Sequence, residues 1–245
     1  PTPARCASAI SAARPRRSAP HLRGVGAAAL DLLLISHDDS DHSGGAKSVV
    51  DAIGARRLLG SVESGDARHA LGGLSVERCR RGDSWLWDGV RFEILNPAAG
   101  VALTRNGNTS ACVLRVSNAS GAVLLAADAD LKAEADMIAA GALARATVLA
   151  APHHGSRSSS SEAFVAGVSP RWVLYSAGYR NRFGHPHPDV LERYSRSGAL
   201  ALRTDRDGAL LFAFGSEVRL VARWRESGKR YWQAEWVGEP YTAQR

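Results

Sequence analysis

The hydrophobic pattern of the chain changes period several times, from short continuous runs to apolar residues spaced three or four apart. Short apolar runs bounded by glycine or polar residues predict strands, and the wider spacing predicts amphipathic helices. The predicted helices cover residues 43–53, 131–143, 160–168 and 188–197. The predicted strands cover residues 30–35, 57–60, 75–80, 84–87, 90–95, 111–117, 122–126, 147–151, 172–176, 200–203, 209–214 and 218–224. Because helices recur between strands that outnumber them, this order favours an α/β sandwich with mixed sheets over a doubly wound parallel sheet.

A cluster of ionisable side chains follows directly after the first predicted strand. His37, Asp39 and Asp41 occupy alternate positions, and His42 follows Asp41. A tight turn can direct such a set toward one or two divalent ions, as two-metal hydrolytic sites require. Imidazole and carboxylate together suit Zn²⁺, Mn²⁺ or Fe²⁺, and the share of carboxylates favours Mn²⁺. A solvated acidic turn with incidental histidines is the competing interpretation.

Two more carboxylates follow the strand predicted at 122–126. Asp128 and Asp130 stand between this strand and the helix predicted at 131–143. A carboxylate at a strand end is well placed to bridge two metal ions. An aspartate just before a helix is equally suited to accept hydrogen bonds from the first N–H groups of that helix. The sequence leaves both roles open.

Histidines also follow the strand predicted at 147–151. Either His153 or His154 could bind a metal ion there. Ser156 and Arg157 offer hydrogen-bond donors to a phosphate group, close to the start of the next predicted helix. A serine-rich loop with an exposed histidine pair is the structural alternative.

The segment 178–188 combines arginine, aromatic and histidine side chains before the last predicted helix. Guanidinium groups suit phosphate and aromatic rings suit base stacking, so Asn181 and Arg182 are candidate substrate-binding residues. His185 could donate a proton or a hydrogen bond to a phosphate oxygen. Read alone, the segment is equally compatible with an ordinary structured turn.

The formal net charge of the 245-residue chain is +7. A basic balance favours polyanionic partners such as nucleic acid or anionic lipid. A preference for arginine codons would produce the same balance, since Lys47, Lys132 and Lys229 are the only lysines. No apolar run approaches the roughly 20 residues needed to cross a membrane.

Three cysteines, Cys6, Cys79 and Cys112, are too few and too scattered to predict a disulfide framework or a thiolate zinc site. Cys112 lies in an apolar run and is expected to be a small core residue. Residues 1–25 contain arginine, alanine, serine and proline but no acidic residue. We expect a disordered or non-native basic segment over 1–25 and a folded domain over 26–245.

Together these motifs resemble the metallo-β-lactamase superfamily. Residues 37–42 match its signature His-x-[His/Asp]-x-Asp-His. Within the superfamily, the chain resembles the C-terminal domain of ComEC-type DNA-internalisation competence proteins. That closer resemblance is carried by SHDDSDHSGG at 36–45, NTSACVLRV at 108–116, APHHGSRSSSS at 151–161 and AGYRNRFGHPHPDVLERY at 177–194.

The resemblance implies a four-layer αββα sandwich that holds two divalent ions, Mn²⁺ or Zn²⁺, and cleaves phosphodiesters. It implies that Asp41 orients the attacking water. The ligands that it implies are His37, Asp39, Asp41 and His42 in the first motif, Asp128 as the bridging carboxylate, and His153 or His154 as the last histidine.

The chain departs from the superfamily pattern at several positions. Asn108 and Ser110 stand where the superfamily has a separate middle histidine, as in ComEC-like domains, and become candidate substrate-binding residues. The glycine that usually precedes the bridging aspartate is Ala127, which is expected to crowd the backbone at the metal. The strands that normally precede the first motif are not evident in residues 1–25, so the N-terminal part of the sheet is expected to be missing or replaced.

The resemblance favours a metal-dependent nuclease domain of a DNA-uptake protein. In that family the domain is proposed to degrade the DNA strand that is not imported. The expected partners are single-stranded DNA and an upstream membrane channel domain, and the expected place is the outer, periplasmic face of the cytoplasmic membrane. The alternatives are another hydrolase on the same fold, such as a β-lactamase or thioesterase, and a catalytically inactive DNA-binding module.

Overall fold

The computed structural model describes residues 6–8, 22–24, 26–62, 71, 73–102 and 107–228. The remainder of the predicted N-terminal segment lies outside the described residues. In chain order the elements are β1 (Cys6–Ser8), β2 (Leu32–Ile35), α2 (Ser40–Ser43), α3 (Ala46–Ile53), β3 (Leu58–Gly60), β4 (Val76–Arg78), β5 (Ser84–Trp87), β6 (Val90–Asn96), η2 (Gly107–Ser110), β7 (Val113–Asn118), β8 (Gly121–Leu125), α4 (Leu131–Ala139), β9 (Val148–Ala150), η3 (Pro152–Gly155), α5 (Glu162–Val168), β10 (Trp172–Tyr175), α6 (Pro188–Arg196), β11 (Leu200–Arg203), α7 (Thr204–Asp207), β12 (Leu210–Phe214), β13 (Val218–Arg223) and α8 (Trp224–Ser227).

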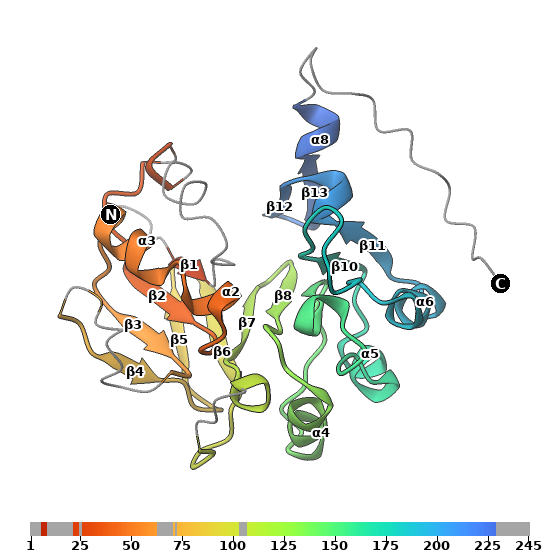
Figure 1. The fold of residues 1–245 in the computed structure, drawn as a ribbon, viewed down its shortest axis with the longest axis horizontal. Helices are drawn as coiled ribbons and strands as arrows, with labels where there is room; N and C mark the ends of the chain where they lie inside the picture. Colours follow the sequence, from red (N-terminus) through yellow and green to blue (C-terminus); the bar gives the residue numbers. More distant parts are fainter. Residues whose placement is uncertain are drawn as a thin grey trace.

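The smaller of the two main sheets is parallel throughout and has the order β1–β2–β3–β4. Strands β2 and β3 are buried along their whole length, as expected of parallel strands covered on both faces. Strand β1 lies within the basic N-terminal segment and pairs with β2. Residues 6–8 therefore supply an edge strand to this sheet (Figure 1).

The larger sheet has seven strands in the order β11–β10–β9–β8–β7–β6–β5. Strands β5 to β8 pair antiparallel: two-residue turns connect β5 to β6 and β7 to β8, and a longer loop with η2 connects β6 to β7. Strands β8 to β11 pair parallel because α4, α5 and α6 provide crossover connections. The mixed sheet that the element order predicted is confirmed.

Strand β2 illustrates how the two sheets and their helices form layers. Successive side chains of a strand point to opposite faces. Leu33 and Ile35 accordingly pack with α3 on the outer face, whereas Leu32 and Leu34 pack against the seven-stranded sheet. Helices α4, α5 and α6 cover the other face of that sheet (Figure 1). The result is the predicted four-layer αββα sandwich.

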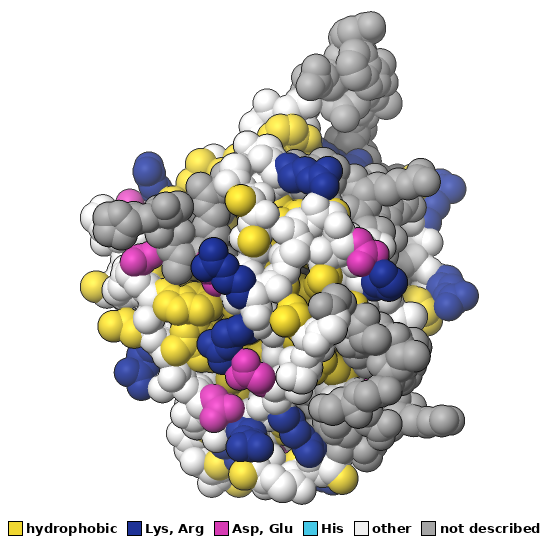
Figure 2. All heavy atoms as spheres, turned by 90° about the vertical axis from the view of Figure 1, so that its left-hand side faces the viewer, with side chains coloured by type: hydrophobic (Ala, Val, Ile, Leu, Met, Phe, Trp, Pro, Cys, Tyr) yellow, Lys and Arg dark blue, Asp and Glu magenta, His cyan; other side chains and the backbone are white. Residues whose placement is uncertain are grey.

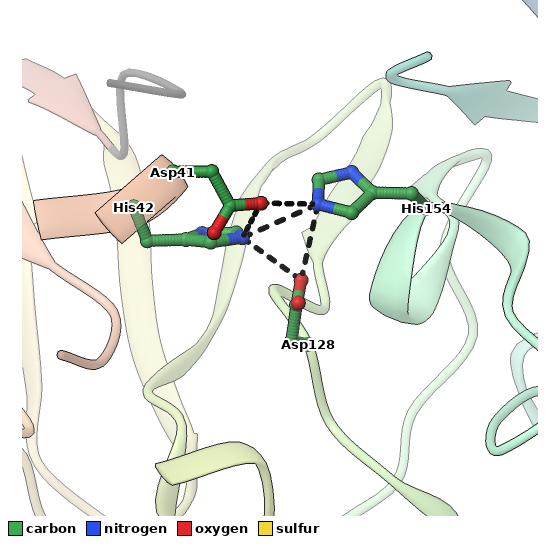
Figure 3. Close-up of side chains that lie close together, drawn as sticks. All are labelled: Asp41, His42, Asp128 and His154. Atoms are coloured by element: carbon green, nitrogen blue, oxygen red, sulfur yellow. Dashed lines mark hydrogen bonds and ion pairs between the residues drawn. The ribbon is translucent and has the colours of Figure 1, made fainter. Parts of the chain in front are cut away.

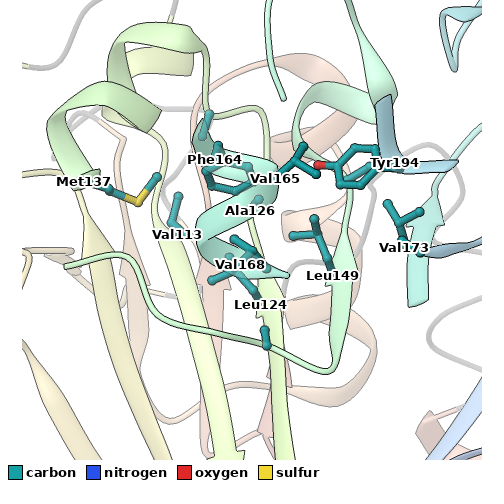
Figure 4. Packing of buried hydrophobic residues seen from close by; sticks show 14 of the residues in the cluster. Val113, Leu124, Ala126, Met137, Leu149, Phe164, Val165, Val168, Val173 and Tyr194 are labelled. Atoms are coloured by element: carbon teal, nitrogen blue, oxygen red, sulfur yellow. The ribbon is translucent and has the colours of Figure 1, made fainter. Parts of the chain in front are cut away.

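The largest core cluster lies between these three helices and the seven-stranded sheet (Figure 4). Met137, Phe164 and Tyr194 from the helices are fully buried. Their partners on the strands are smaller side chains, among them Leu124 and Leu149. This packing fixes the ends of β8 and β9, from which the loops of the candidate site emerge.

A disulfide bond joins the two sheets. Cys79 follows β4, Cys112 precedes β7, and their Cα atoms lie 6.0 Å apart. Both side chains are buried in the layer between the sheets. The predicted burial of Cys112 is confirmed, but the sequence analysis missed its pairing with Cys79. Their separation of 33 positions in the sequence leaves no local signal for the pairing.

After β11, strands β12 and β13 form a separate two-stranded sheet. This sheet packs on β10 through Phe212 and Trp172, whose ring centroids lie 5.5 Å apart. The short helices α7 and α8 were not predicted, and Trp224 begins α8 instead of ending a strand. The helix predicted over 43–53 is divided into α2 and α3. Across the part of the chain that the structure describes, no helix combines the length and apolar character of a membrane-spanning segment.

Candidate metal centre

Three loops that follow strands meet at one point between the two sheets. The loop after β2 contains the polar motif 37–42 and continues into α2. The loop after β8 contains Asp128, and η3 after β9 contains His153 and His154. Figure 3 shows side chains from all three loops pointing toward one another. Residues far apart in sequence therefore form one cluster.

Asp128 lies at the centre of this cluster and is almost fully buried. Its Oδ1 atom lies 3.0 Å from His42 Nε2 and 3.6 Å from His154 Nε2. Its Oδ2 atom lies 3.6 Å from His153 Nε2 and 3.9 Å from His37 Nε2. The two carboxylate oxygens of one aspartate thus face two separate sets of imidazoles.

The potential ligand atoms fall into two groups, each with all its atoms within 4.8 Å of one another. The His37 group consists of His37, Asp39 and Asp128, and the His42 group consists of Asp41, His42, Asp128 and His154. Asp128 belongs to both, which is the position of a bridging ligand. Imidazole and carboxylate donors suit Zn²⁺ or Mn²⁺.

His37 provides an independent test of whether these residues fit a metal ion. Its side chain is fully buried, and its Nε2 atom has no hydrogen-bond partner. That atom lies 3.5 Å from Asp39 Oδ2 and faces Asp128. A buried ring nitrogen without a partner is unfavourable unless a ligand satisfies it. The residues therefore fit a metal site.

The protonation of His37 and Asp128 favours metal binding, whereas at His42 a metal ion would have to displace a proton. Burial lowers the pKa of His37, and the charge of His42 lowers it further, so the neutral, ligating form is favoured. Burial also lowers the pKa of His42, but hydrogen bonding to Asp128 and the charge of Asp128 outweigh it, and the net shift is upward. Burial raises the pKa of Asp128, but the hydrogen bond and charge of His42, followed by the charges of His154 and His153, lower it to about 2. Asp128 is therefore a carboxylate at any physiological pH.

The loops that carry the cluster adopt a backbone conformation that only glycine adopts easily. Ala127, His153 and His154 have φ angles of 48°, 46° and 55°. A side chain in this left-handed region costs about 1–2 kcal/mol per residue. Such residues persist where the surrounding structure holds them, and they concentrate at functional sites. The His153 N–H donates to the Ala127 carbonyl at 2.8 Å, which joins the two loops.

The sequence comparison identifies the family. The model of the metallo-beta-lactamase superfamily matches residues 6–171 of the chain. The chain belongs to this superfamily. The predicted ligand signature and the four-layer fold agree with that membership.

Two curated relatives are similar to most of the chain. "Competence protein ComA" of Neisseria gonorrhoeae is 37% identical over 215 residues, which cover 87% of this chain and 29% of that protein. "ComE operon protein 3" of Bacillus subtilis is 30% identical over 207 residues, which cover 81% of this chain and 26% of that protein. The predicted resemblance to the ComEC type is confirmed. The chain spans less than a third of the length of these relatives.

Among solved structures, the chain is similar in part to Igni18, described as a metallo hydrolase from the archaeon Ignicoccus hospitalis. It has a TM-score of 0.46 and 16% sequence identity, and the match covers 71% of this chain and 76% of that chain.

Ala127 stands where the superfamily usually has a glycine, directly before Asp128. The left-handed φ angle of 48° at this position explains why glycine is common there. Of the two aspartates after β8, Asp128 belongs to the cluster, and Asp130 is the N-cap of α4, accepting a hydrogen bond from Ala133 N at 2.9 Å. The two roles left open by the sequence are thus divided between two neighbouring residues.

The structure also separates the two histidines of η3. His154 completes the His42 group, whereas His153 lies outside both groups. The Nδ1 atom of His153 lies 3.0 Å from Ser158 Oγ and 3.4 Å from Asn108 Nδ2. The geometry thus favours His154 as the histidine ligand and places Asn108 beside the centre.

The remaining predicted substrate residues lie around the centre at varying distance. Ser110 is buried and donates to the Gly107 carbonyl. Ser156 contacts Ser158, and Arg157 is exposed beside Asp189. The substrate roles of Ser110, Ser156 and Arg157 stay predictions.

The segment 178–185 forms an exposed aromatic and basic loop next to the centre. Asn181 exchanges hydrogen bonds with the backbone of His185 and so shapes this loop. Phe183 is 66% exposed and stacks on His185, whose ring centroid lies 5.9 Å from that of His153. The Arg182 guanidinium lies 4.8 Å from the centre of the Phe183 ring. A row of flat side chains therefore extends from the centre toward solvent.

The charge distribution elsewhere is less informative. On the face shown in Figure 2, lysine and arginine side chains are interspersed with acidic and apolar ones. The positive net charge therefore does not mark a single binding patch on that face.

Sequence reasoning missed two buried polar residues at the site. Ser36, just before the first motif, lies within hydrogen-bond distance of two cluster histidines. Glu134 on α4 accepts hydrogen bonds from the backbone N–H groups of Ser160 and Ser161, the latter at 2.7 Å. Ser36 stands directly before the ligand motif, but its residue type does not show that its hydroxyl contacts two imidazoles. The partners of Glu134 lie 26 and 27 residues away in the sequence.

Proposed function

We propose that the chain is a metal-dependent phosphodiesterase that cleaves DNA, as the nuclease domain of a ComEC-like DNA-uptake protein. The observation that carries the proposal is the pair of ligand groups that share Asp128. Its membership of the metallo-β-lactamase superfamily and its similarity to competence proteins support the same conclusion.

The His37 group and the His42 group would each hold one divalent ion. The two ions would supply a Lewis acid that activates water and stabilises charge on the phosphoryl oxygens. Asp41 is half exposed, and its carboxylate lies 3.3 Å from His154 Nε2. It can therefore hold and orient a water molecule at the open side of the centre, whereas buried Asp128 can only hold the ions.

His185 lies at the border between the centre and the exposed loop. Burial lowers its pKa, and the charges of His153 and His154 lower it further. A neutral imidazole retains one N–H group. We infer that His185 donates a hydrogen bond to a phosphate oxygen of the substrate and does not act as the main proton donor.

The exposed loop supports a single-stranded nucleic acid substrate. Tyr179 and Phe183 present ring faces on which unpaired bases can stack, and Arg180 and Arg182 lie against these rings within reach of phosphate groups. Bases of a duplex are already stacked and would not use these rings. This supports single-stranded DNA as the substrate, and the choice of the non-imported strand rests on the similarity to competence proteins alone.

The disulfide between Cys79 and Cys112 supports an oxidising compartment. In this proposal the domain works at the outer, periplasmic face of the cytoplasmic membrane beside an upstream membrane channel domain of the same protein.

The experiment is a cleavage assay on the purified chain with Mn²⁺ or Zn²⁺, using end-labelled single-stranded and double-stranded DNA. We expect metal-dependent cleavage that is lost in Asp128→Asn. The matched control is Asp51→Asn, which changes an exposed aspartate on α3 that pairs only with Lys47 among the ion pairs found.

Other outcomes would support other functions. Turnover of the chromogenic β-lactam nitrocefin without DNA cleavage would favour a different hydrolase on this fold. A folded chain that retains no metal, yet binds DNA with a steep salt dependence, would indicate a DNA-binding module without catalysis. Either result would refute the proposal.

A further inference from the structure

One buried hydroxyl group stands between two histidines of the candidate centre. Ser36 Oγ lies 3.1 Å from His37 Nδ1 and 3.2 Å from His42 Nδ1. Ser36 is 1% exposed, and no other hydrogen-bond partner of its hydroxyl occurs among the described residues. Its own carbonyl accepts a hydrogen bond from Cys112 N at 2.8 Å, so the seven-stranded sheet fixes its position.

These two contacts determine which way the imidazoles face. In both rings Nδ1 points to Ser36, so Nε2 points into the centre. His37 Nε2 faces Asp39 and the Oδ2 side of Asp128, and His42 Nε2 faces the Oδ1 side of Asp128. The two histidines belong to different ligand groups. One hydroxyl therefore orients a ligand of each metal position.

Counting protons shows what this hydroxyl must do in each state. Ser36 has one hydrogen and two lone pairs. Without metal it can accept Nδ1–H of His37 and donate to Nδ1 of His42, whose Nε2–H then faces Asp128 Oδ1 at 3.0 Å. A histidine that binds metal through Nε2 must carry its proton on Nδ1. When both positions are filled, Ser36 must therefore accept from both rings.

We propose that Ser36 is a positioning residue shared by both metal positions, because its one hydroxyl group contacts Nδ1 of a histidine in each ligand group. This inference rests on the proposed metal site but not on the identity of the substrate. It predicts that removing one hydroxyl weakens the binding of both ions, although Ser36 contacts neither.

The test compares metal binding to the wild-type chain, Ser36→Ala and Ser61→Ala. Ser61 is a matched control because it is also buried, and its hydroxyl has no hydrogen-bond partner among the described residues. Stepwise dissociation constants for Mn²⁺ and Zn²⁺ are measured by competition with a chromophoric chelator, and bound metal is counted by elemental analysis. Thermal unfolding without metal shows whether each variant folds.

For Ser36→Ala we expect both dissociation constants to rise roughly 10- to 100-fold, the usual effect of losing a hydrogen bond to a metal-binding histidine. For Ser61→Ala we expect no change. Unchanged constants in Ser36→Ala, or a rise in only one of them, would overturn the inference.

A measurement on the wild-type chain covers the case in which Ser36→Ala does not fold. Nitrogen-15 spectra of the zinc-loaded protein report the tautomer of each imidazole. Both His37 and His42 should carry the proton on Nδ1, and a proton on Nε2 of either ring would overturn the inference.

The two proposals fail in different ways. A wild-type chain that binds two ions with Ser36→Ala binding them equally well removes the role of Ser36 and leaves the nuclease proposal intact. Weaker metal binding by Ser36→Ala, together with no DNA cleavage by the wild-type chain, supports the role of Ser36 and refutes the nuclease proposal. A wild-type chain that binds no metal refutes both.

Discussion

Reducing the disulfide between Cys79 and Cys112 should lower the stability of the domain substantially. The bond connects the end of β4 to the start of β7 and so closes a long loop across the two sheets. In the native state both sulfur atoms stay buried in the same core layer after reduction. Most of the effect should therefore come from the unfolded chain, which gains conformational freedom.

The magnitude follows from the sequence separation of 33 residues. For a loop of that length, the chain-entropy relation gives about 12–13 cal/mol/K, which is about 4 kcal/mol at 25 °C. For a domain of this size, each kcal/mol shifts the melting temperature by about 2–4 °C. Reduction should therefore lower the melting temperature by about 8–16 °C.

The assay is guanidinium unfolding and calorimetry of the chain before and after treatment with a phosphine reductant, with Cys79→Ala/Cys112→Ala as an unreducible comparison. Thiol titration of the unfolded protein should increase by two groups on reduction. If the oxidised and reduced chains unfold at the same denaturant concentration, the cross-link is absent or its entropic account is wrong.

Three further predictions concern single side chains. Ala127 has a φ of 48°, so Ala127→Gly should raise the free energy of unfolding, measured by chemical denaturation, by about 1 kcal/mol. The control Ala126→Gly, at the buried end of the neighbouring strand, should lower it. A loss of stability in Ala127→Gly would contradict the strain argument. Replacing the buried Glu134 by glutamine leaves one backbone N–H without an acceptor and should lower the free energy of unfolding by about 1–3 kcal/mol. The control Glu162→Gln, at the exposed start of α5, should have no measurable effect. Equal effects of the two variants would refute the role of the buried carboxylate. The pKa of Asp128 is lowered to about 2 in the folded protein, whereas it is near 4 in the unfolded chain. The ionised carboxylate therefore stabilises the metal-free fold at pH values above about 4. This contribution disappears as the pH falls from about 4 to about 2. The stability difference between wild type and Asp128→Asn, followed by denaturation across this pH range without metal, should shrink in the same window, and a constant difference would refute the assignment.

The sequence was sufficient to predict the layers of the fold because the pattern of short apolar runs and helical spacing recurs in the chain. It also located the residues of the cluster, because each candidate closely follows a strand, and the ends of β2, β8 and β9 converge in the fold. Residue types alone could not separate Asp128 from Asp130, since helix capping and metal bridging both favour an aspartate after a strand, and only the resemblance to the superfamily favoured Asp128.

What the sequence could not supply depends on long-range geometry. His154, and not His153, enters the His42 group because of the left-handed backbone at both residues. The residue types at these positions do not predict that backbone conformation. Cys79 and Cys112 become neighbours only when the two sheets pack together. The contact of Ser36 with two imidazoles likewise exists only after the chain has turned into α2.

The candidate centre lies on the seam between the two sheets, and this has a consequence for folding. His42 and His154, whose Nε2 atoms lie 3.4 Å apart, are separated by 112 residues and are carried by different sheets. Neither sheet alone holds a complete His42 group, so an ion bound there adds its binding energy to the docked state only. The metal content of a preparation therefore measures the fraction of chains in which the two halves have come together.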